Sequence, residues 1–180
     1  TRAAAPQTAQ PSQRRVNDVL GALVDTGIVL RARHPPAYLY RLNRDHVAAE
    51  GIMALSRQRE TLLERIRHHV AAWQIPPVSA SLFGSAARGE AGPRSDVDIV
   101  LVSGLQGERE AAIWVGQIDQ LAQRVFDWSG NRCEILELTE AEVVDAATDG
   151  GRLVRELRAD AIHLGGRDLR SILTTAQASA

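Results

Sequence analysis

Residues 79–102, SASLFGSAARGEAGPRSDVDIVLV, constrain the fold of this chain more than any other stretch. Ser79–Phe83 is a short, mostly apolar run that enters Gly84-Ser85, and Val97–Val102 is a nearly unbroken run of β-branched and apolar residues. Both runs have the composition of buried strands, whereas the residues between them are typical of a turn, a short helix and a loop. The sequence therefore predicts two strands that bracket one polar loop.

Two aspartates, Asp96 and Asp98, stand one residue apart where the second predicted strand begins. Side chains on a strand alternate between its faces, so both carboxylates project from the same side. Carboxylates held this close repel each other, and a shared proton or a cation relieves the repulsion. Beside glycine, serine and arginine residues, a hard divalent cation with oxygen ligands is the more natural remedy. The pair therefore predicts half of a magnesium site.

Gly84-Ser85 supplies the complementary half of such a site. A Gly-Ser turn that opens a helix presents free backbone N–H groups and a hydroxyl, which suit phosphate oxygens. Glycine also lets the backbone approach a ligand closely and adopt a positive φ. Arg88, about one helical turn after Ser85, adds a positive charge within reach of the same phosphates. A metal site beside a phosphate cradle is typical of phosphoryl or nucleotidyl transfer.

These two elements together resemble a known signature. The segments GSAARG (84–89) and SDVDI (95–99), with five residues between them, look like the signature of the minimal nucleotidyltransferases of the DNA polymerase β-like superfamily. The match includes both elements and their spacing, so it is more specific than either element alone. The resemblance implies an α/β (α+β) fold with a small mixed sheet and flanking helices.

The resemblance also implies a site and a reaction. It places Gly84, Ser85, Arg88 and Ser95 at a nucleoside triphosphate, with ATP as the expected nucleotide, and Asp96 and Asp98 at two Mg²⁺ ions. A nucleoside monophosphate would pass to a hydroxyl of a protein, an RNA or a small molecule, and pyrophosphate would be released.

A third carboxylate is implied on a neighbouring strand, where it would complete the second metal site or act as general base. Glu134 in the run RCEIL is the best candidate, although the family more often has aspartate there. Glu137 is the alternative, on the opposite strand face from Glu134.

Composition excludes several classes of protein. The chain has 180 residues, 44% of them hydrophobic and 24% charged, as in an ordinary globular protein. No apolar run is long enough to span a bilayer, so we expect no membrane contact and a cytoplasmic location. The single cysteine, Cys133, is interpreted as a small apolar residue of a strand. Residues 1–67 hold eleven arginines and six acidic residues, whereas residues 68–180 hold ten and sixteen, which indicates two functional halves.

The first half is predicted to begin with a helix and a hairpin. Ser12 is a good N-cap for a helix to about Thr26, Gly27 ends it, and residues 28–33 and 37–42 have strand character. With Arg31, Arg33 and Arg41 nearby, this order resembles the second half of a winged helix-turn-helix, which implies DNA contact through Ser12 to Asn43. A module used for dimerisation, or for packing on the catalytic domain, is an equally good interpretation. Residues 1–11, interrupted by prolines, are predicted as a short helical piece or loose chain.

Three regions follow from these patterns: a winged-helix-like module in residues 1–44, a helical linker in 45–77 and a nucleotidyltransferase domain in 78–180. Within the linker, a helical region over 46–73 is predicted to be capped by Asp45 and broken at Gly51. Beyond the signature, a helix over 108–128 is predicted with Val115 and Phe126 among its core residues, and Thr139 with Glu142 forms a capping box for another helix.

The sequence leaves the function open between two classes. The first is the magnesium-dependent nucleotidyltransferase, which includes a toxin that modifies tRNA. The second is a binding protein, either a DNA-binding regulator or the antitoxin-type partner of a cognate toxin, since members of the family occur in such pairs. A homodimer is compatible with both.

Overall fold

The computed structural model describes residues 12–90 and 95–178, which belong to two compact units, Thr1–Gln58 and Arg59–Ala180. The segment 1–11, predicted as a short helical piece or loose chain, lies outside the described residues. The first unit contains four elements, namely α1 (Gln13–Asp25), β1 (Val29–His34), β2 (Ala37–Leu42) and α2 (Ala49–Ser56).

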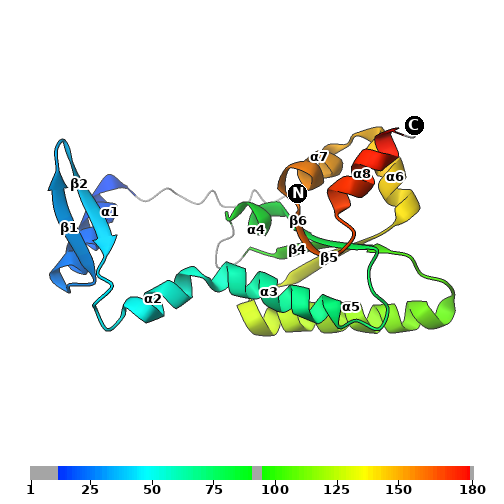
Figure 1. The fold of residues 1–180 in the computed structure, drawn as a ribbon, viewed down its shortest axis with the longest axis horizontal. Coiled ribbons are helices and arrows are strands. Elements are labelled where there is room, and N and C mark those ends of the chain that lie inside the picture. The colour runs from blue at the N-terminus through cyan, green and yellow to red at the C-terminus, as the bar shows by residue number, and fades with distance from the viewer. Residues whose placement is uncertain (1–11, 91–94, 179–180) are drawn as a thin grey trace, which may run out of the picture. The chain divides into compact units, whose positions relative to one another are not determined.

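The predicted helix and hairpin of the first unit are confirmed (Figure 1). The Ser12 hydroxyl caps α1 by accepting the backbone N–H of Arg15 at 3.4 Å, and Gly27 follows the helix with a φ of +76°. β1 and β2 pair antiparallel, from Val29 opposite Leu42 to His34 opposite Ala37. Whether this module is a winged helix stays a prediction.

The predicted limits of the next helical region are wrong at two positions. Asp45 does not cap a helix, because it lies in a turn that ends at Ala48, the residue before α2. In that turn the backbone N–H of Asp45 is bonded to the side-chain oxygen of Asn43 at 3.3 Å. The break falls at Arg57 and not at Gly51, which lies inside α2. A single glycine costs a helix only about 1 kcal/mol, so burial elsewhere in the element outweighs it.

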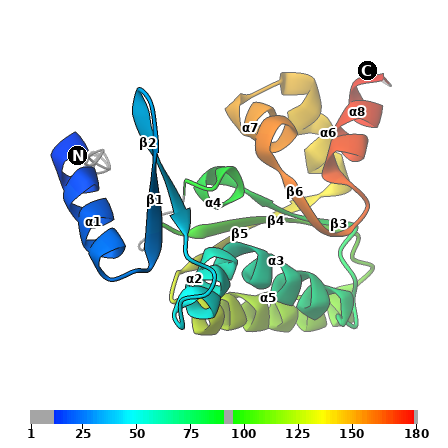
Figure 2. The ribbon, with the colours of Figure 1, turned by 60° about the vertical axis from the view of Figure 1, so that its left-hand side comes forward.

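The second unit is a mixed four-stranded sheet in the order β5-β4-β3-β6 with helices on both faces (Figure 2). β3 pairs antiparallel with β4 and β6, and β4 pairs parallel with β5. The predicted α/β fold with a small mixed sheet is confirmed. The elements of this unit are α3 (Gln58–Ala71), β3 (Ser79–Phe83), α4 (Gly84–Arg88), β4 (Val97–Ser103), α5 (Glu108–Ser129), β5 (Cys133–Thr139), α6 (Glu140–Asp149), α7 (Arg152–Asp160), β6 (Ile162–Gly166) and α8 (Leu169–Ala178).

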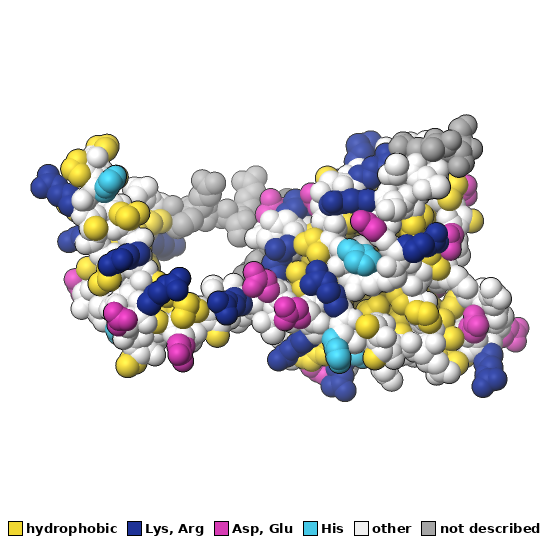
Figure 3. Space-filling model, viewed as in Figure 1, with side chains coloured by type: hydrophobic (Ala, Val, Ile, Leu, Met, Phe, Trp, Pro, Cys, Tyr) yellow, Lys and Arg dark blue, Asp and Glu magenta, His cyan; other side chains and the backbone are white. Residues whose placement is uncertain are grey.

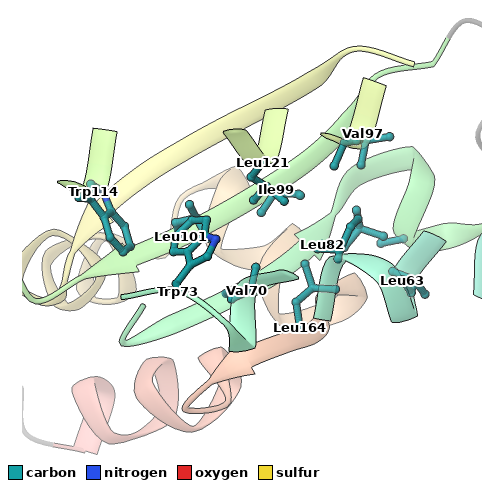
Figure 4. Close-up of a cluster of buried hydrophobic side chains, with 14 residues drawn as sticks. Leu63, Val70, Trp73, Leu82, Val97, Ile99, Leu101, Trp114, Leu121 and Leu164 are labelled. Atoms are coloured by element: carbon teal, nitrogen blue, oxygen red, sulfur yellow. The ribbon is translucent and has the colours of Figure 1, made fainter. Parts of the chain in front are cut away.

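β4 is buried on both faces, which explains its nearly unbroken apolar sequence. Ile99 and Leu101 face α3 and α5, where they join a core cluster with Leu121 (Figure 4). Val100 and Val102 face the other way, into a second cluster formed with α6, α7 and α8. The strand that carries Asp98 is therefore held firmly between two helical layers.

The predicted core side of α5 is wrong in part. Val115 and Phe126 are 55% and 50% exposed, whereas Trp114, Leu121 and Val125 are buried. The buried residues follow helical spacing along the face toward the sheet, and Val115 and Phe126 each lie one residue beyond it. Among the described residues, no helix is both long and apolar enough to cross a membrane.

Candidate active site

Gly84 brings the two halves of the signature into contact. β3 ends at Phe83, which lies opposite Asp98 in the antiparallel β3–β4 register, and Gly84 follows with a φ of +70°. A Cβ atom placed on Gly84 would lie 2.3 Å from the Asp98 Oδ2 atom and 3.2 Å from its Cγ atom. Only glycine allows both this backbone conformation and this close approach of a carboxylate. The Gly-Ser turn and Asp98 of the aspartate pair therefore lie side by side.

The three predicted carboxylates lie at one end of the neighbouring strands β4 and β5. Asp98 lies opposite Glu134 in the parallel β4–β5 register, and Asp96 precedes Asp98 by two residues. The pKa of Asp98 is raised, first by burial and then by the negative charges of Asp96 and Glu134. Glu137, the alternative third carboxylate, lies opposite Leu101, farther along the strand and on its other face. The register thus favours Glu134 over Glu137.

The donor chemistry fits a hard divalent cation. Asp96, Asp98 and Glu134 offer only carboxylate oxygens. A cation would relieve the repulsion that, after burial, contributes to the raised pKa of Asp98. Within residues 12–90 and 95–178, no three His, Cys, Asp or Glu side chains are gathered as a ready metal cluster. The fit to Mg²⁺ therefore rests on the chemistry of these carboxylates, with Asp96 and Asp98 two residues apart and Glu134 on the adjacent strand.

Arg88, predicted at the phosphates, is paired with two carboxylates. Its Nε atom lies 2.8 Å from a Glu90 oxygen, and its Nη1 atom lies 3.0 Å from an oxygen of Asp160 on α7. These hydrogen bonds, to Glu90 first and to Asp160 second, raise the pKa of Arg88. The positive charge of Arg88 also acts on Asp98, where it offsets part of the rise in the pKa of that carboxylate.

Sequence reasoning missed the residues that α7 brings to the site. Glu156 is close enough to Asp98 to raise its pKa, and its carboxylate is paired with Arg152 at 2.7 Å. Asp160, one turn further along α7, holds Arg88. No local pattern marks these residues, because only the fold brings α7 beside α4.

The loop before β4 is tied to the beginning of β5. The side-chain amide of Asn131 donates to the backbone carbonyl of Ser95 at 2.7 Å, and the N–H of Val97 donates to the carbonyl of Arg132 at 2.8 Å. These bonds place Ser95 and Asp96 beside the strand that carries Glu134. Asn131 could have been suspected from its place in the run Ser129-Gly130-Asn131, whose residue types are typical of a turn.

Cys133 lies next to Glu134, and it is not a nucleophile. Burial, followed by the charges of Asp98 and Glu134, raises the pKa of its thiol to about 12. The thiol therefore stays protonated near neutral pH. Its partial packing against the core cluster agrees with the predicted role as a small apolar residue.

The fold and the site define a nucleotidyl-transfer domain, and comparison with known proteins agrees. Residues 60–154 match the family model described as "Nucleotidyltransferase domain", so this chain belongs to that family. The predicted family is thereby confirmed. The match includes the Gly84-Ser85 turn, both aspartates and Glu134, and it ends within α7.

The chain was also compared with curated proteins and with solved structures. No curated protein matches the chain. One solved structure that it resembles is described as "Crystal structure of the toxin-antitoxin with AMP-PNP", with 19% sequence identity and a TM-score of 0.36. That alignment covers 56% of this chain and 72% of the other chain.

Proposed function

We propose that this chain is a magnesium-dependent nucleotidyltransferase that moves a nucleoside monophosphate, with ATP as the expected donor, to a hydroxyl of a protein, an RNA or a small molecule. Membership of the family supports nucleotidyl transfer as the reaction class. The observation that carries the proposal is the contact of Asp98 with Gly84, because it joins a carboxylate pair to a turn suited to phosphate.

Each site residue has a proposed role. Gly84, Ser85 and Ser95 hold the triphosphate through backbone N–H groups and hydroxyls, and Arg88 adds positive charge from its place beside Glu90 and Asp160. Asp96 and Asp98 would hold Mg²⁺, with Glu134 as a further ligand. The bound ion supplies charge neutralisation at the phosphates and lowers the pKa of the acceptor hydroxyl.

Glu134 can also take the acceptor proton. In the proposed reaction the acceptor oxygen forms a bond to the α-phosphorus, and the bond from that phosphorus to the leaving pyrophosphate oxygen breaks. The proton of the acceptor hydroxyl passes to the Glu134 carboxylate, which lies exposed at the edge strand of the sheet.

Label transfer tests the proposal. The purified protein is incubated with Mg²⁺ and each of the four α-³²P-labelled nucleoside triphosphates, with and without cell extract, beside an Asp96→Asn, Asp98→Asn variant. We expect label on a protein, an RNA or a small molecule with wild type alone. If wild type moves no label and binds no triphosphate, the enzymatic function is excluded, and a binding partner of antitoxin type becomes the better account.

A second proposal concerns the first unit, whose hairpin we infer to contact DNA. Residues 26–44 contain four arginines and no acidic residue. Alternation along β1 puts Arg31 and Arg33 on one face, opposite Tyr40 and Tyr38 in the register, and the Arg31 guanidinium lies 5.1 Å from the centre of the Tyr38 ring. Figure 3 shows arginine side chains over this unit. Basic and aromatic side chains on one exposed face suit a nucleic-acid backbone.

The opposite face of the hairpin offers a matched control. Arg41 is exposed and lies opposite Leu30, so it projects from the other face than Arg31. We expect Arg31→Ala to weaken binding of a labelled DNA duplex and to reduce the salt slope by about 1, and Arg41→Ala to do neither. Equal loss in both variants, or no binding by wild type, would contradict DNA contact through this face.

A further inference from the structure

Helix α4 carries the Gly84-Ser85 turn, and it is too short to hold its own position. It spans five residues, Gly84–Arg88, and isolated helices of this length are unstable because nucleation is unfavourable. Yet the turn must be placed accurately, since Gly84 lies against the Asp98 carboxylate. The position of α4 therefore depends on contacts with other elements.

One anchor comes from α3. The Nε atom of Arg59 donates to the backbone carbonyl of Ala86 at 3.0 Å, and its Nη2 atom donates to the carbonyl of Ala87. Both carbonyls belong to the last turn of α4, and the Ala86 carbonyl also accepts the backbone N–H of Gly89 at 3.4 Å. A cation at this end is also favoured by the helix dipole. Arg59 thus both satisfies and fixes the C-terminal end of α4.

The second anchor comes from α7. Arg88, the last residue of α4, is bonded to Asp160 at 3.0 Å, and the side chain of Asp160 is 23% exposed. Arg59 and Asp160 thus contact α4 from two different helices. Both lie outside the family match, which begins at residue 60 and ends at residue 154.

We propose that Arg59 and Asp160 are positioning residues that fix α4, and with it the Gly84-Ser85 turn, for binding of the nucleoside triphosphate. Neither residue touches the reacting groups. Loss of either contact leaves the chemistry of the carboxylates intact and weakens triphosphate binding. This inference rests on the proposed function.

The test measures binding of α,β-methylene-ATP with MgCl₂ by calorimetry, together with KM, kcat and the thermal midpoint. Arg59→Gln and Asp160→Asn are the test variants. Arg67→Gln is the control for Arg59→Gln. Arg67 also lies on α3, but it donates to the backbone carbonyl of His163 at 3.2 Å and not to a carbonyl of α4. Glu140→Gln is the control for the second, because it breaks the Arg167–Glu140 ion pair.

Arg59→Gln removes two charge-assisted hydrogen bonds to α4 and Asp160→Asn weakens one. We expect each test variant to weaken binding by about tenfold or more, with KM raised, kcat retained and a thermal midpoint like that of the controls. Arg59→Lys keeps the positive charge and should recover part of the loss. Unchanged binding in either test variant, or an equal loss in its control, would overturn the inference. Wild type that binds no triphosphate would instead refute the proposed function, and the inference with it.

Discussion

At the scale of single residues, Gly84 and Asp98 depend on each other. The carboxylate of Asp98 occupies the space that a side chain at position 84 would need, and it does so although burial and two neighbouring carboxylates oppose its charge. Such a costly arrangement is typical of a functional site. Three predictions belong to this scale.

Replacing Gly84 with alanine should slow the reaction by on the order of 100-fold. The new Cβ would collide with Asp98 and displace it, and a misplacement of about 1 Å costs on the order of 100-fold in rate. Gly89→Ala is the matched control, because Gly89 has a similar φ of +74° and a Cβ atom there would meet no other atom within 4 Å. Comparable label transfer by the Gly84→Ala variant and wild type would show that the contact is dispensable.

Asp98→Asn should raise the thermal midpoint at pH 7 while it abolishes label transfer. The pKa of Asp98 is higher in the folded protein than in the unfolded chain, so proton binding favours folding. That stabilisation is fully present below the ordinary aspartate pKa and is lost as the pH rises through the raised value. The increase in thermal midpoint that Asp98→Asn gives should therefore become smaller as the pH falls. Thermal melts of wild type and variant from pH 3 to 8 measure this difference, and Asp119→Asn, at an exposed position of α5, is the control. A lowered thermal midpoint of Asp98→Asn at pH 7 would contradict the prediction.

Cys133 should react slowly with thiol reagents in the folded protein. Its pKa of about 12 leaves little thiolate at pH 8, whereas the unfolded chain has the ordinary value. Alkylation by iodoacetamide, followed by mass spectrometry in native buffer and in urea, measures the difference. Equal rates in the two states would show that the thiol is not held protonated.

At the scale of elements, α6 and α5 show two ways in which the sequence specifies a helix, by a cap and by a buried stripe. Thr139 begins α6 with a capping box, in which its hydroxyl accepts the Glu142 N–H at 3.2 Å and its own N–H donates to the Glu142 carboxylate at 2.7 Å. α5 is specified by a buried stripe. The residues of α5 that face the sheet and the residues beside them are equally apolar. Burial, and not hydrophobicity alone, distinguishes them.

Thr139→Ala should lower the free energy of unfolding by about 1 kcal/mol, the usual contribution of an N-cap. Hydrogen bonds to the Thr139 backbone and side chain lower the pKa of Glu142, so the stabilisation that they give is present at neutral pH and lost as the pH falls through that pKa. Urea unfolding at pH 7 and pH 3 measures it. Thr148→Ala is the control, because that hydroxyl bonds to the Val144 carbonyl inside α6, and an equal effect there would contradict the capping role.

Leu121→Ala should lower the free energy of unfolding by about 2–5 kcal/mol, because Leu121 is fully buried in the core cluster. Val115→Ala, on the same helix but 55% exposed, should lower it by less than about 1 kcal/mol. Urea unfolding of both variants distinguishes the two faces of α5. A larger loss from Val115→Ala would contradict the assigned buried stripe.

At the scale of the whole molecule, the sheet converts a local signature into a site. The roles of Gly84, Asp96 and Asp98 could be predicted from the sequence. Side chains two residues apart on a strand share a face, and a Gly-Ser turn allows a close approach of the backbone. Glu134 could be suspected as well, because a strand, helix and strand in succession favour neighbouring parallel strands. The contacts of Arg59 with α4, and of Arg88 with Asp160 across 72 positions, could not be predicted, because no local pattern encodes them. The sequence also wrongly predicts Val115 in the core of α5, since Val115 directly follows the apolar residues Ile113 and Trp114.

The most direct test of the nucleotidyltransferase account compares two labels of one donor. Wild type is incubated with Mg²⁺, acceptor extract and ATP labelled with ³²P at either the α or the γ position, beside the Asp96→Asn, Asp98→Asn variant. The account predicts that α label enters the acceptor, that γ label leaves as pyrophosphate, and that the variant transfers neither. Label from the γ position in the acceptor would show phosphoryl transfer instead, and α label transferred equally by the variant would place the reaction outside this site.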